Sequence, residues 1–378
     1  MIPEYGFSTP AELGMTVDQV QTPCLVIDMQ ALEYNLKTLA DQVEEMGVRL
    51  RVHAKAHKSV DIAKLQQVIG GACGICCQKV SEAEVFVRAG FRDVLITNEV
   101  RQPSKIDRMA RLALGGARVL CCVDDLENVA ELSEGASKYG VQIECLVEFD
   151  CGGGRCGVKS EDEVLKIAIA IEAARNLKFA GIQAYQGKAQ HIQVYSERRD
   201  AIAISTAQVA EVKVHLETAG LSCDIVGGGG TGTFAFEGGS GVYNELQCGT
   251  YALMDADYNR VESAEGVCQP MFKNALFILT SVMSKTKRGI AVCDAGLKTH
   301  AVDSGLPKMF ERTDVEFIHC ADEHGVINDP QDKLCINDQL LLVPGHCDPT
   351  CNLHDFFVCM RDHKVEALWP ISARGKLL

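Results

Sequence analysis

Short apolar runs alternate with amphipathic stretches from residue 48 to residue 254. Eight of these runs have the length and continuous apolar character of strands buried on both faces, as parallel sheets require. They span residues 48–54, 72–77, 94–97, 119–123, 143–149, 179–184, 223–226 and 246–254. Helix-like stretches lie between them, for example at residues 80–89, 106–113, 161–174 and 201–219. This alternation predicts an α/β fold, a TIM-type (β/α)8 barrel, with a doubly wound open sheet as the alternative.

The pattern changes after about residue 270. Strand-like runs separated by turn residues, with little helix, follow at residues 272–281, 289–294, 315–319, 339–343 and 356–360. We therefore expect a C-terminal domain of mainly antiparallel β structure. The first 25 residues fit neither pattern, so we assign residues 26–270 to the barrel and residues 1–25 plus 271–378 to the β domain.

The acidic composition narrows the range of partners. The formal net charge is −14 and the pI is about 5.2, whereas binding to nucleic acid or to a membrane surface needs a positive face. No run of about 18 uncharged apolar residues is present that could span a membrane. The N-terminus lacks the basic and apolar blocks of a signal peptide. These features predict a soluble, cytoplasmic protein with no nucleic-acid or membrane partner.

The sequence contains 18 cysteines, many of them inside apolar runs. In a long chain without an export signal, such cysteines behave as small buried hydrophobic residues. The single CxxC, Cys73-Gly-Ile-Cys76, has no second pair at zinc spacing. We therefore expect reduced thiols in the core rather than disulfides or a zinc site.

A basic cluster, Val52-His-Ala-Lys-Ala-His-Lys58, ends the first predicted barrel strand. Barrel enzymes place catalytic groups at the carboxyl ends of their strands. In an extended chain, alternation would point His53, Lys55 and His57 to one face and Lys58 to the other. Desolvation and cationic neighbours would lower the pKa of a lysine in the barrel mouth, which suits Schiff-base chemistry. The alternative is an exposed basic loop.

Two glycine-rich segments are candidate phosphate loops. Gly227-Gly-Gly-Gly-Thr-Gly-Thr233 follows the seventh predicted strand, and Cys248-Gly-Thr-Tyr251 lies in the eighth. In barrels the loops after strands seven and eight often bind phosphate, because small residues let backbone N–H groups close on an anion. A structural turn is the alternative. The dinucleotide pattern GxGxxG also fits the first segment, but it fits residues 152–157 equally and is expected in the first βαβ unit.

A third candidate site follows the predicted strand at residues 339–343, in the segment Pro344-Gly-His-Cys-Asp-Pro349. His346 and Asp348 are two positions apart, so an extended segment points both to the same side and Cys347 to the other. An imidazole and a carboxylate, completed by water and substrate oxygen, suit Mn²⁺ or Mg²⁺ better than structural zinc. An ordinary polar turn is the alternative.

Together these segments resemble the D-threonine aldolase, 3-hydroxy-D-aspartate aldolase and D-serine dehydratase family of pyridoxal-phosphate enzymes, which have an alanine-racemase-like fold. The resemblance covers nearly the whole chain, from residues 21–28 to residues 346–348. The order and spacing of the matching motifs support the resemblance more strongly than any single motif does. The most specific pieces are His53-Ala-Lys-Ala-His-Lys58, Gly181-Ile-Gln-Ala-Tyr-Gln-Gly187, Glu245-Leu-Gln-Cys-Gly-Thr-Tyr251 and Asp294-Ala-Gly-Leu-Lys298.

The resemblance implies which residues hold the cofactor, pyridoxal 5′-phosphate. Lys55 would carry it covalently, Arg155 would face its phenolic oxygen and Tyr185 would lie beside its ring. Gln247 stands where racemases place an arginine near the pyridine nitrogen, so a neutral partner is expected there. The phosphate would be held by the two glycine-rich loops, through Gly228, Gly229, Thr231, Gly249 and Thr250.

The resemblance also implies an activity, the metal-dependent cleavage of a D-3-hydroxy amino acid by a carbon–carbon lyase. 3-Hydroxy-D-aspartate would give glycine and glyoxylate, and D-threonine would give glycine and acetaldehyde. His346 and Asp348 match the family's divalent-metal pair. His191 is the candidate base for the β-hydroxyl proton, with a water molecule as the alternative.

Two other functions remain open at this point. A dehydratase acting on D-serine or D-threo-3-hydroxyaspartate would use the same metal to expel the hydroxyl. A non-catalytic pyridoxal-phosphate-binding homeostasis protein would need only the barrel, so the roughly 100 residues beyond Met271 argue against it. The family fold further implies a homodimer, in which the second domain closes over the partner's barrel.

Overall fold

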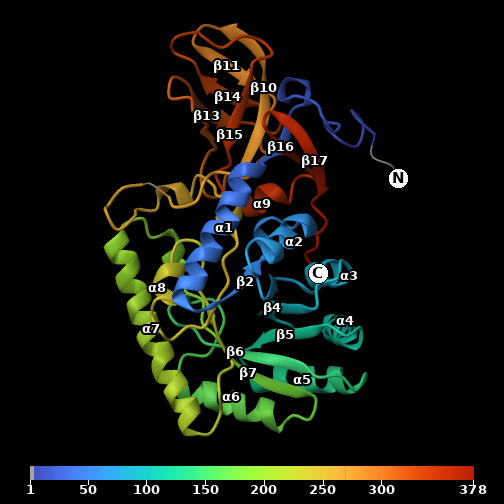
Figure 1. Cartoon of the computed structure of the whole chain (residues 1–378), viewed down its shortest axis with the longest axis vertical. Helices are drawn as coiled ribbons and strands as arrows, with labels where there is room; N and C mark the ends of the chain where they lie inside the picture. Colours follow the sequence, from blue (N-terminus) through green and yellow to red (C-terminus); the bar gives the residue numbers. More distant parts are fainter. Residues whose placement is uncertain (1–3, 269) are drawn as a thin grey trace.

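The computed structural model describes residues 4–268 and 270–378, and its first unit is a closed barrel of parallel strands (Figure 1). Each barrel strand pairs with the next along the chain, and the last strand closes the barrel on the first. The strands are β2 (Arg49–His53), β3 (Gly74–Cys77), β4 (Asp93–Glu99), β5 (Arg118–Val123), β6 (Ile143–Glu148), β7 (Leu177–Gln183), β8 (Ile225–Gly228) and β9 (Glu245–Leu246). The expected (β/α)8 barrel is confirmed, and the doubly wound alternative is wrong.

Helices surround this barrel, and local sequence signals set their ends. The Asp28 carboxylate accepts hydrogen bonds from the first backbone amides of α1, and Gly47, with φ of 68°, ends the same helix in the left-handed region. The helices of the barrel are α1 (Met29–Met46), α2 (Val60–Val68), α3 (Val80–Arg88), α4 (Pro103–Leu114), α5 (Leu126–Ser137), α6 (Glu161–Ala173), α7 (Tyr195–Thr218) and α8 (Phe234–Gly238).

The barrel interior is filled by apolar side chains and closed at its amino-terminal end by ion pairs. Six buried residues, one from each strand from β3 to β8, form a cluster separate from the main core. Below them the Arg51 side chain, 1% exposed, pairs with Glu245 and Asp93 from two other strands. The amino-terminal end of the barrel is therefore sealed, which leaves its carboxyl end for a binding site.

Two predicted strands are shorter than the apolar runs that suggested them. The strand β9 covers Glu245–Leu246, so only the first residue of the eighth run, residues 246–254, is strand. The chain then turns through Gly249 into the 3-10 turn Thr250–Ala252. The first run ends as strand at His53, and Ala54–Ala56 is another 3-10 turn. In both places the chain leaves the sheet and bends over the barrel mouth, so continuous apolar character does not mean continuous strand.

The second unit is a nine-stranded sheet that lies above the barrel in Figure 1. Its pairs are antiparallel except for β1 with β16, which is parallel. β1 lies between β10 and β16, so the domain division expected at residue 26 falls inside this strand. The strands are β1 (Cys24–Asp28), β10 (Leu276–Lys287), β11 (Ile290–Cys293), β12 (Lys308–Met309), β13 (Glu316–Cys320), β14 (Gly325–Asn328), β15 (Gln339–Val343), β16 (Phe356–Arg361) and β17 (Lys364–Pro370).

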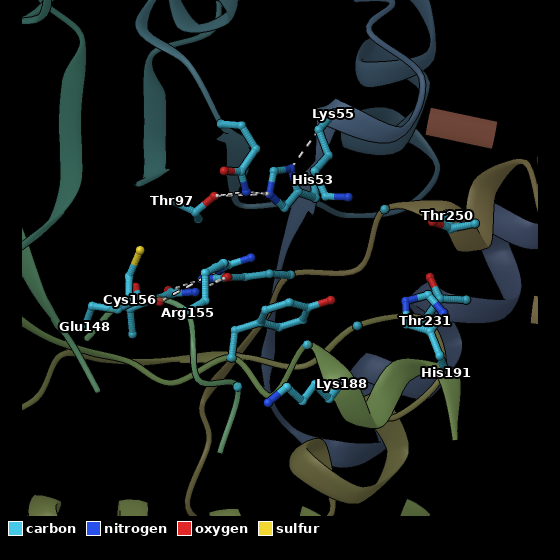
Figure 2. Close-up of a pocket in the computed structure, with 18 of the residues that line it drawn as sticks. His53, Lys55, Thr97, Glu148, Arg155, Cys156, Lys188, His191, Thr231 and Thr250 are labelled. Carbon is cyan, nitrogen blue, oxygen red and sulfur yellow. Dashed lines mark hydrogen bonds and ion pairs between the residues drawn. The ribbon is translucent and has the colours of Figure 1, made fainter. Parts of the chain in front are cut away.

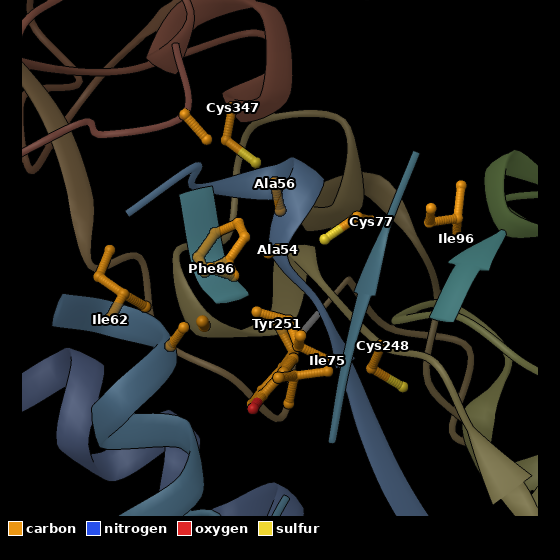
Figure 3. Packing of buried hydrophobic residues seen from close by; sticks show 14 of the residues in the cluster. Ala54, Ala56, Ile62, Ile75, Cys77, Phe86, Ile96, Cys248, Tyr251 and Cys347 are labelled. Atoms are coloured by element: carbon orange, nitrogen blue, oxygen red, sulfur yellow. The ribbon is translucent and has the colours of Figure 1, made fainter. Parts of the chain in front are cut away.

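The two units share one buried core, which Figure 3 shows beneath the turn that follows β2. Ala54 and Ala56, each 1% exposed, point into this core and fix the turn between them. Cys347, fully buried in the short helix α9 (Cys347–Cys351) of the second unit, belongs to the same cluster. The residues on either side of these anchors are therefore held where the two units meet.

All 18 cysteines are free thiols, and most of them are buried, as expected for core residues. Burial is also the first cause of the raised pKa of Cys24, which lies at about 12. Within the described chain, no helix combines the length and the apolar character needed to cross a membrane.

Candidate active site

A cavity of about 330 Å³ opens at the carboxyl ends of the barrel strands. Figure 2 shows Lys55 and His53 on one side of it, and Thr231 and Thr250 across it from Glu148. Its lining comes from most of the barrel strands and the loops that follow them. The lining residues are His53, Lys55, Gln78, Thr97, Glu148, Phe149, Asp150, Gly153, Arg155, Cys156, Gln183, Tyr185, Gly187, Lys188, His191, Gly230, Thr231, Gln247, Gly249, Thr250 and Tyr258.

The structure thus brings together most of the residues that the sequence singled out. Lys55, Arg155, Tyr185, His191, Thr231, Gln247, Gly249 and Thr250 all line the cavity. Gly228 and Gly229 do not line it, and their neighbour Gly230 does. His346 and Asp348 lie outside the lining, yet Asp348 contacts Lys55 directly.

Lys55 projects into the cavity because its two alanine neighbours are anchored in the core. The turn is stabilised by His53, whose Nδ1 accepts a hydrogen bond from the Lys55 backbone at 3.4 Å. The Lys55 ammonium donates to the Asp348 carboxylate. Burial disfavours the charge on Lys55 and is the largest single effect on its pKa, but Asp348, Tyr185 and Cys347 together raise the pKa of the lysine above its ordinary value. The expected lowering of this pKa is therefore wrong.

The alternation argument for the basic cluster is only partly right, because the chain is not extended beyond His53. His57 is fully buried and its Nε2 lies 3.1 Å from Oε1 of Gln66, away from the cavity. Lys58 has a positive φ of 55° and pairs with Glu82 in a buried position. Lys55 is therefore the lysine of this cluster that reaches the cavity.

The glycine-rich loop after β8 packs too closely for side chains. A Cβ on Gly228 would lie 2.4 Å from the carbonyl oxygen of Ala184. Gly229 has a φ of 72°, which favours glycine. The Thr231 hydroxyl accepts a hydrogen bond from the backbone amide of Tyr251 at 2.9 Å, which joins the two glycine-rich segments and leaves its own proton to donate.

Gln247 is hydrogen-bonded to a second glutamine in the cavity, Gln183. Its side-chain amide and that of Gln183 form a reciprocal pair, with N–O distances of 2.7 and 2.8 Å. Both residues are buried, so the pair fixes which atoms each amide presents to the cavity. Gln183 was not identified as a site residue from the sequence, although it lies in the strand predicted at residues 179–184 and ends the observed β7.

Arg155 lies at the side of the cavity opposite the glycine loops. Its guanidinium is 6.0 Å from the centroid of the Tyr185 ring and 4.0 Å from Oε1 of Glu148. Glu148 is 6% exposed. Burial, and then the nearby Glu99 carboxylate, raise the pKa of Glu148 to about 8. An arginine placed this way can bind an oxygen anion in the cavity, as the resemblance implied.

One group of three side chains with ligand atoms within 4.8 Å of one another lies beside Arg155. It comprises Glu99, Asp124 and Cys156, all partly exposed. Only Cys156 lines the cavity. We assign no ion to this group.

The two candidate metal ligands from the sequence, His346 and Asp348, lie side by side. Nε2 of His346 lies 3.9 Å from Oδ1 of Asp348. Nδ1 of His346 lies 2.7 Å from Asp303, a partner of the kind that orients metal-binding histidines. Cys347 is fully buried and its backbone amide donates to Asp255 at 3.0 Å. Alternation is only partly right for it, because the helix α9 begins at Cys347 and its Sγ lies 3.3 Å from Oδ1 of Asp348. Asp303 was not identified from the sequence, and Asp255 was part of the family resemblance but was given no role.

His191 ends the 3-10 turn Lys188–His191 and is about half exposed at the cavity. Its Nδ1 lies 2.6 Å from Oδ2 of Asp257. This hydrogen bond is the first cause of the raised pKa of His191. Asp257 was also missed, because the sequence offers no local signal that pairs residues 66 positions apart.

Two family models match the chain in succession. The model described as "Alanine racemase, N-terminal domain" matches residues 27–257, and the one described as "Putative serine dehydratase domain" matches residues 275–360. The first covers the barrel and the second lies within the β unit.

The chain is also similar to proteins of known activity along its whole length. It is 55% identical over 375 residues to 3-hydroxy-D-aspartate aldolase of Paracoccus denitrificans (strain Pd 1222), covering 99% of this chain and 97% of that protein. Identity to D-threonine aldolase of an Arthrobacter species is 42% over 368 residues, covering 97% and 96%. The crystal structure of D-threonine aldolase from Filomicrobium marinum superimposes with a TM-score of 0.95 at 45% identity, covering 98% of this chain and all of that one. The chain therefore belongs to the alanine-racemase-like family of pyridoxal-phosphate enzymes that includes D-threonine aldolase and 3-hydroxy-D-aspartate aldolase.

Proposed function

We propose that this chain is a pyridoxal-phosphate- and divalent-metal-dependent aldolase, a carbon–carbon lyase that cleaves D-3-hydroxy amino acids to glycine and an aldehyde. The contact between Lys55 and Asp348 carries this proposal, since it joins residues 293 positions apart. In this proposal the lysine that would carry the cofactor lies against the carboxylate that would bind the metal. The substrate's amine and hydroxyl are on adjacent carbons, so the groups that act on them must also be adjacent.

The residues that line the cavity have the chemistry needed to bind pyridoxal phosphate. The loops at Thr231 and Gly249 supply backbone and hydroxyl donors for the phosphate, and a Cβ on Gly249 would lie 2.8 Å from the His53 carbonyl oxygen. Tyr185 offers a ring face, and Gln247 would meet the pyridine nitrogen. The cofactor, when bound through Lys55, supplies an acceptor for the electron pair released as the Cα–Cβ bond breaks.

A divalent ion, Mn²⁺ or Mg²⁺, fits the donor set of His346 and Asp348. The 3.9 Å between Nε2 and Oδ1 allows both atoms to bind one ion, and the Asp303 carboxylate orients the imidazole. Such an ion would lower the pKa of the substrate's β-hydroxyl.

This chain's own residues then bind the substrate and move its proton. Arg155 supplies a cation at the cavity wall for an anionic oxygen. His191 accepts the proton of the β-hydroxyl, and Lys55 is freed as an amine when the substrate amine takes its place. The apolar anchors Ala54 and Ala56 keep Lys55 directed at the reacting carbon throughout.

We expect 3-hydroxy-D-aspartate as the better substrate and D-threonine as the poorer one, because the identity to the hydroxyaspartate aldolase is the higher of the two. A product assay with both substrates, before and after chelation, tests the proposal. Glycine should appear with glyoxylate or acetaldehyde, chelation should abolish turnover, and Mn²⁺ or Mg²⁺ should restore it. Ammonia released in step with substrate loss would instead indicate a dehydratase, and no metal-stimulated turnover would indicate a binding protein.

The cofactor assignment has its own test. Lys55→Ala should lose the visible absorbance band of the bound cofactor, whereas Lys64→Ala, at an exposed lysine of α2, should keep it. If the band survives in Lys55→Ala, the assignment is wrong and Lys188, which also lines the cavity, becomes the candidate in place of the buried Lys58.

We also propose a cytoplasmic location, in which the 18 free thiols would stay reduced. As the family fold implies, we infer a homodimer in which the β unit faces the partner's barrel. Sedimentation equilibrium tests the dimer, since a monomer at micromolar concentration would contradict it.

A further inference from the structure

We propose that Asp257 is a positioning residue that fixes the tautomer and orientation of His191, so that the two form the proton-transfer pair of the site. This inference rests on the proposed function, in which His191 accepts the β-hydroxyl proton. Its basis is the 2.6 Å contact between Nδ1 of His191 and Oδ2 of Asp257. A carboxylate can only accept, so Nδ1 must be the protonated nitrogen of the ring.

The remaining ring nitrogen, Nε2, is then the one available to substrate. His191 lines the cavity, and its Nε2 has no hydrogen-bond partner within residues 4–268 and 270–378. With the proton held on Nδ1, Nε2 carries the lone pair that can accept a proton. The pair therefore has the geometry of a general base whose orientation is set by a third group.

Asp257 is itself held in place. Its side chain is 13% exposed, whereas that of His191 is 54% exposed. The other carboxylate oxygen pairs with Arg260, and Arg260 also donates to the carbonyl oxygen of Ser304 at 3.1 Å. Ser304 directly follows Asp303, which orients His346. One chain of contacts thus links the proposed base to the loop that supports the metal pair.

The charged surroundings of His191 favour its protonated form. The Asp257 and Asp255 carboxylates raise its pKa, while burial and the Lys55 ammonium lower it. Tyr258 lies 6.0 Å away, ring to ring, and stays neutral because burial raises its pKa. Removing the Asp257 charge should therefore lower the pKa of His191, and the direction of this change can be measured.

The substitution Asp257→Asn tests the pair, because an asparagine amide would donate to Nδ1 and force the proton onto Nε2. We expect kcat for aldol cleavage to fall about 100-fold, as for loss of a general base, with KM changed less than about threefold. The acidic limb of the kcat/KM profile should move to lower pH. Asp257→Glu, which keeps the carboxylate, should recover part of kcat.

A matched control comes from a second histidine–aspartate contact far from the cavity. His215 in α7 lies 3.1 Å from Asp162 in α6, and Asp162→Asn should leave kcat and the pH profile unchanged. If Asp257→Asn keeps the kcat of the original chain, or if Asp257→Glu is as impaired as Asp257→Asn, the proposal is overturned.

A titration independent of turnover separates this inference from the proposed function. In the protein labelled with ¹³C-histidine, the His191 resonance, assigned with His191→Asn, should titrate at a lower pH in Asp257→Asn than in the original chain. An unchanged titration overturns the pairing whatever the activity. A shifted titration in a protein that cleaves no D-3-hydroxy amino acid supports the pairing and rejects the aldolase.

Discussion

A buried carboxyl behind the phosphate loop should make the stability of this protein fall as the pH rises. Glu237 in α8 is 1% exposed. Its Oε1 accepts a hydrogen bond from the Thr233 hydroxyl at 2.8 Å, and its Oε2 has no partner in the described structure. Burial is the first cause of its raised pKa, which moves from 4.5 to about 7.

The direction of the pH effect on stability follows from the pH at which the folded and the unfolded chain each release the Glu237 proton. The unfolded chain loses it near pH 4.5, while the folded chain keeps it until about pH 7. Between these values ionisation favours the unfolded state, so stability falls with rising pH and then levels off. The full gap corresponds to about 3.4 kcal/mol, of which about 2.5 kcal/mol is lost between pH 5 and pH 8.

Glu237→Gln should remove this loss, because glutamine has the shape of the protonated acid and can still accept from Thr233. A chain of 378 residues should shift its melting temperature by about 1.3 °C per kcal/mol. We therefore expect the variant to gain about 3 °C relative to the original protein on going from pH 5 to pH 8. Thermal melting of the variant and the original protein at pH 5 and at pH 8 measures this difference.

The matched control is Glu197→Gln, at an exposed position of α7, which should follow the original protein at both pH values. Parallel pH profiles for Glu237→Gln and the original protein would refute the reasoning, because they would mean that Glu237 is already ionised at pH 5. A neutral acid at this position also matters for function. A carboxylate would repel a phosphate held by the adjacent loop at Gly229.

Two further substitutions should act through packing and charge. Arg51→Ala would leave the buried Glu245 with Arg49, at 3.3 Å, as its ion-pair partner, so we expect a loss of about 3–5 kcal/mol and a lower melting temperature. Arg49→Ala should cost much less, and equal losses would contradict this account. Gly228→Ala would place a Cβ 2.4 Å from the Ala184 carbonyl oxygen and should weaken inorganic phosphate binding measured by calorimetry, whereas unchanged affinity would show that the loop can move.

The barrel could be predicted from the sequence because parallel strands are buried on both faces and form continuous apolar runs. The same signal failed where the chain leaves the sheet without losing apolar character. Residues after Leu246 continue the run but form a turn at Gly249. Alternation failed for His57 for the same reason, since it assumes an extended backbone that ends at His53. Predicting side-chain directions from strand alternation therefore needs independent evidence of where the strand ends.

The partners of the site residues could not be predicted, because their contacts join distant parts of the chain. Gln183 and Gln247 are 64 positions apart, and His346 and Asp303 are 43 apart. A local pattern holds no information on such pairs. One general signal was available, however. Gln183 and Glu148 are the last residues of their barrel strands, where side chains turn towards the mouth.

The proximity of Lys55 to the metal pair is determined by core packing more than by their own contact. Ala54 and Ala56 on the barrel side and Cys347 on the β-unit side are buried in one cluster (Figure 3). Each reactive side chain is a direct neighbour of such an anchor, so it points away from the core and into the space where the two units meet. An ion pair of a partly exposed lysine contributes little stability by itself, whereas the buried anchors are dispersed over both units. The relative placement of cofactor and metal is thus a property of the interface between the barrel and the sheet, which explains why the second unit is indispensable to the proposed chemistry.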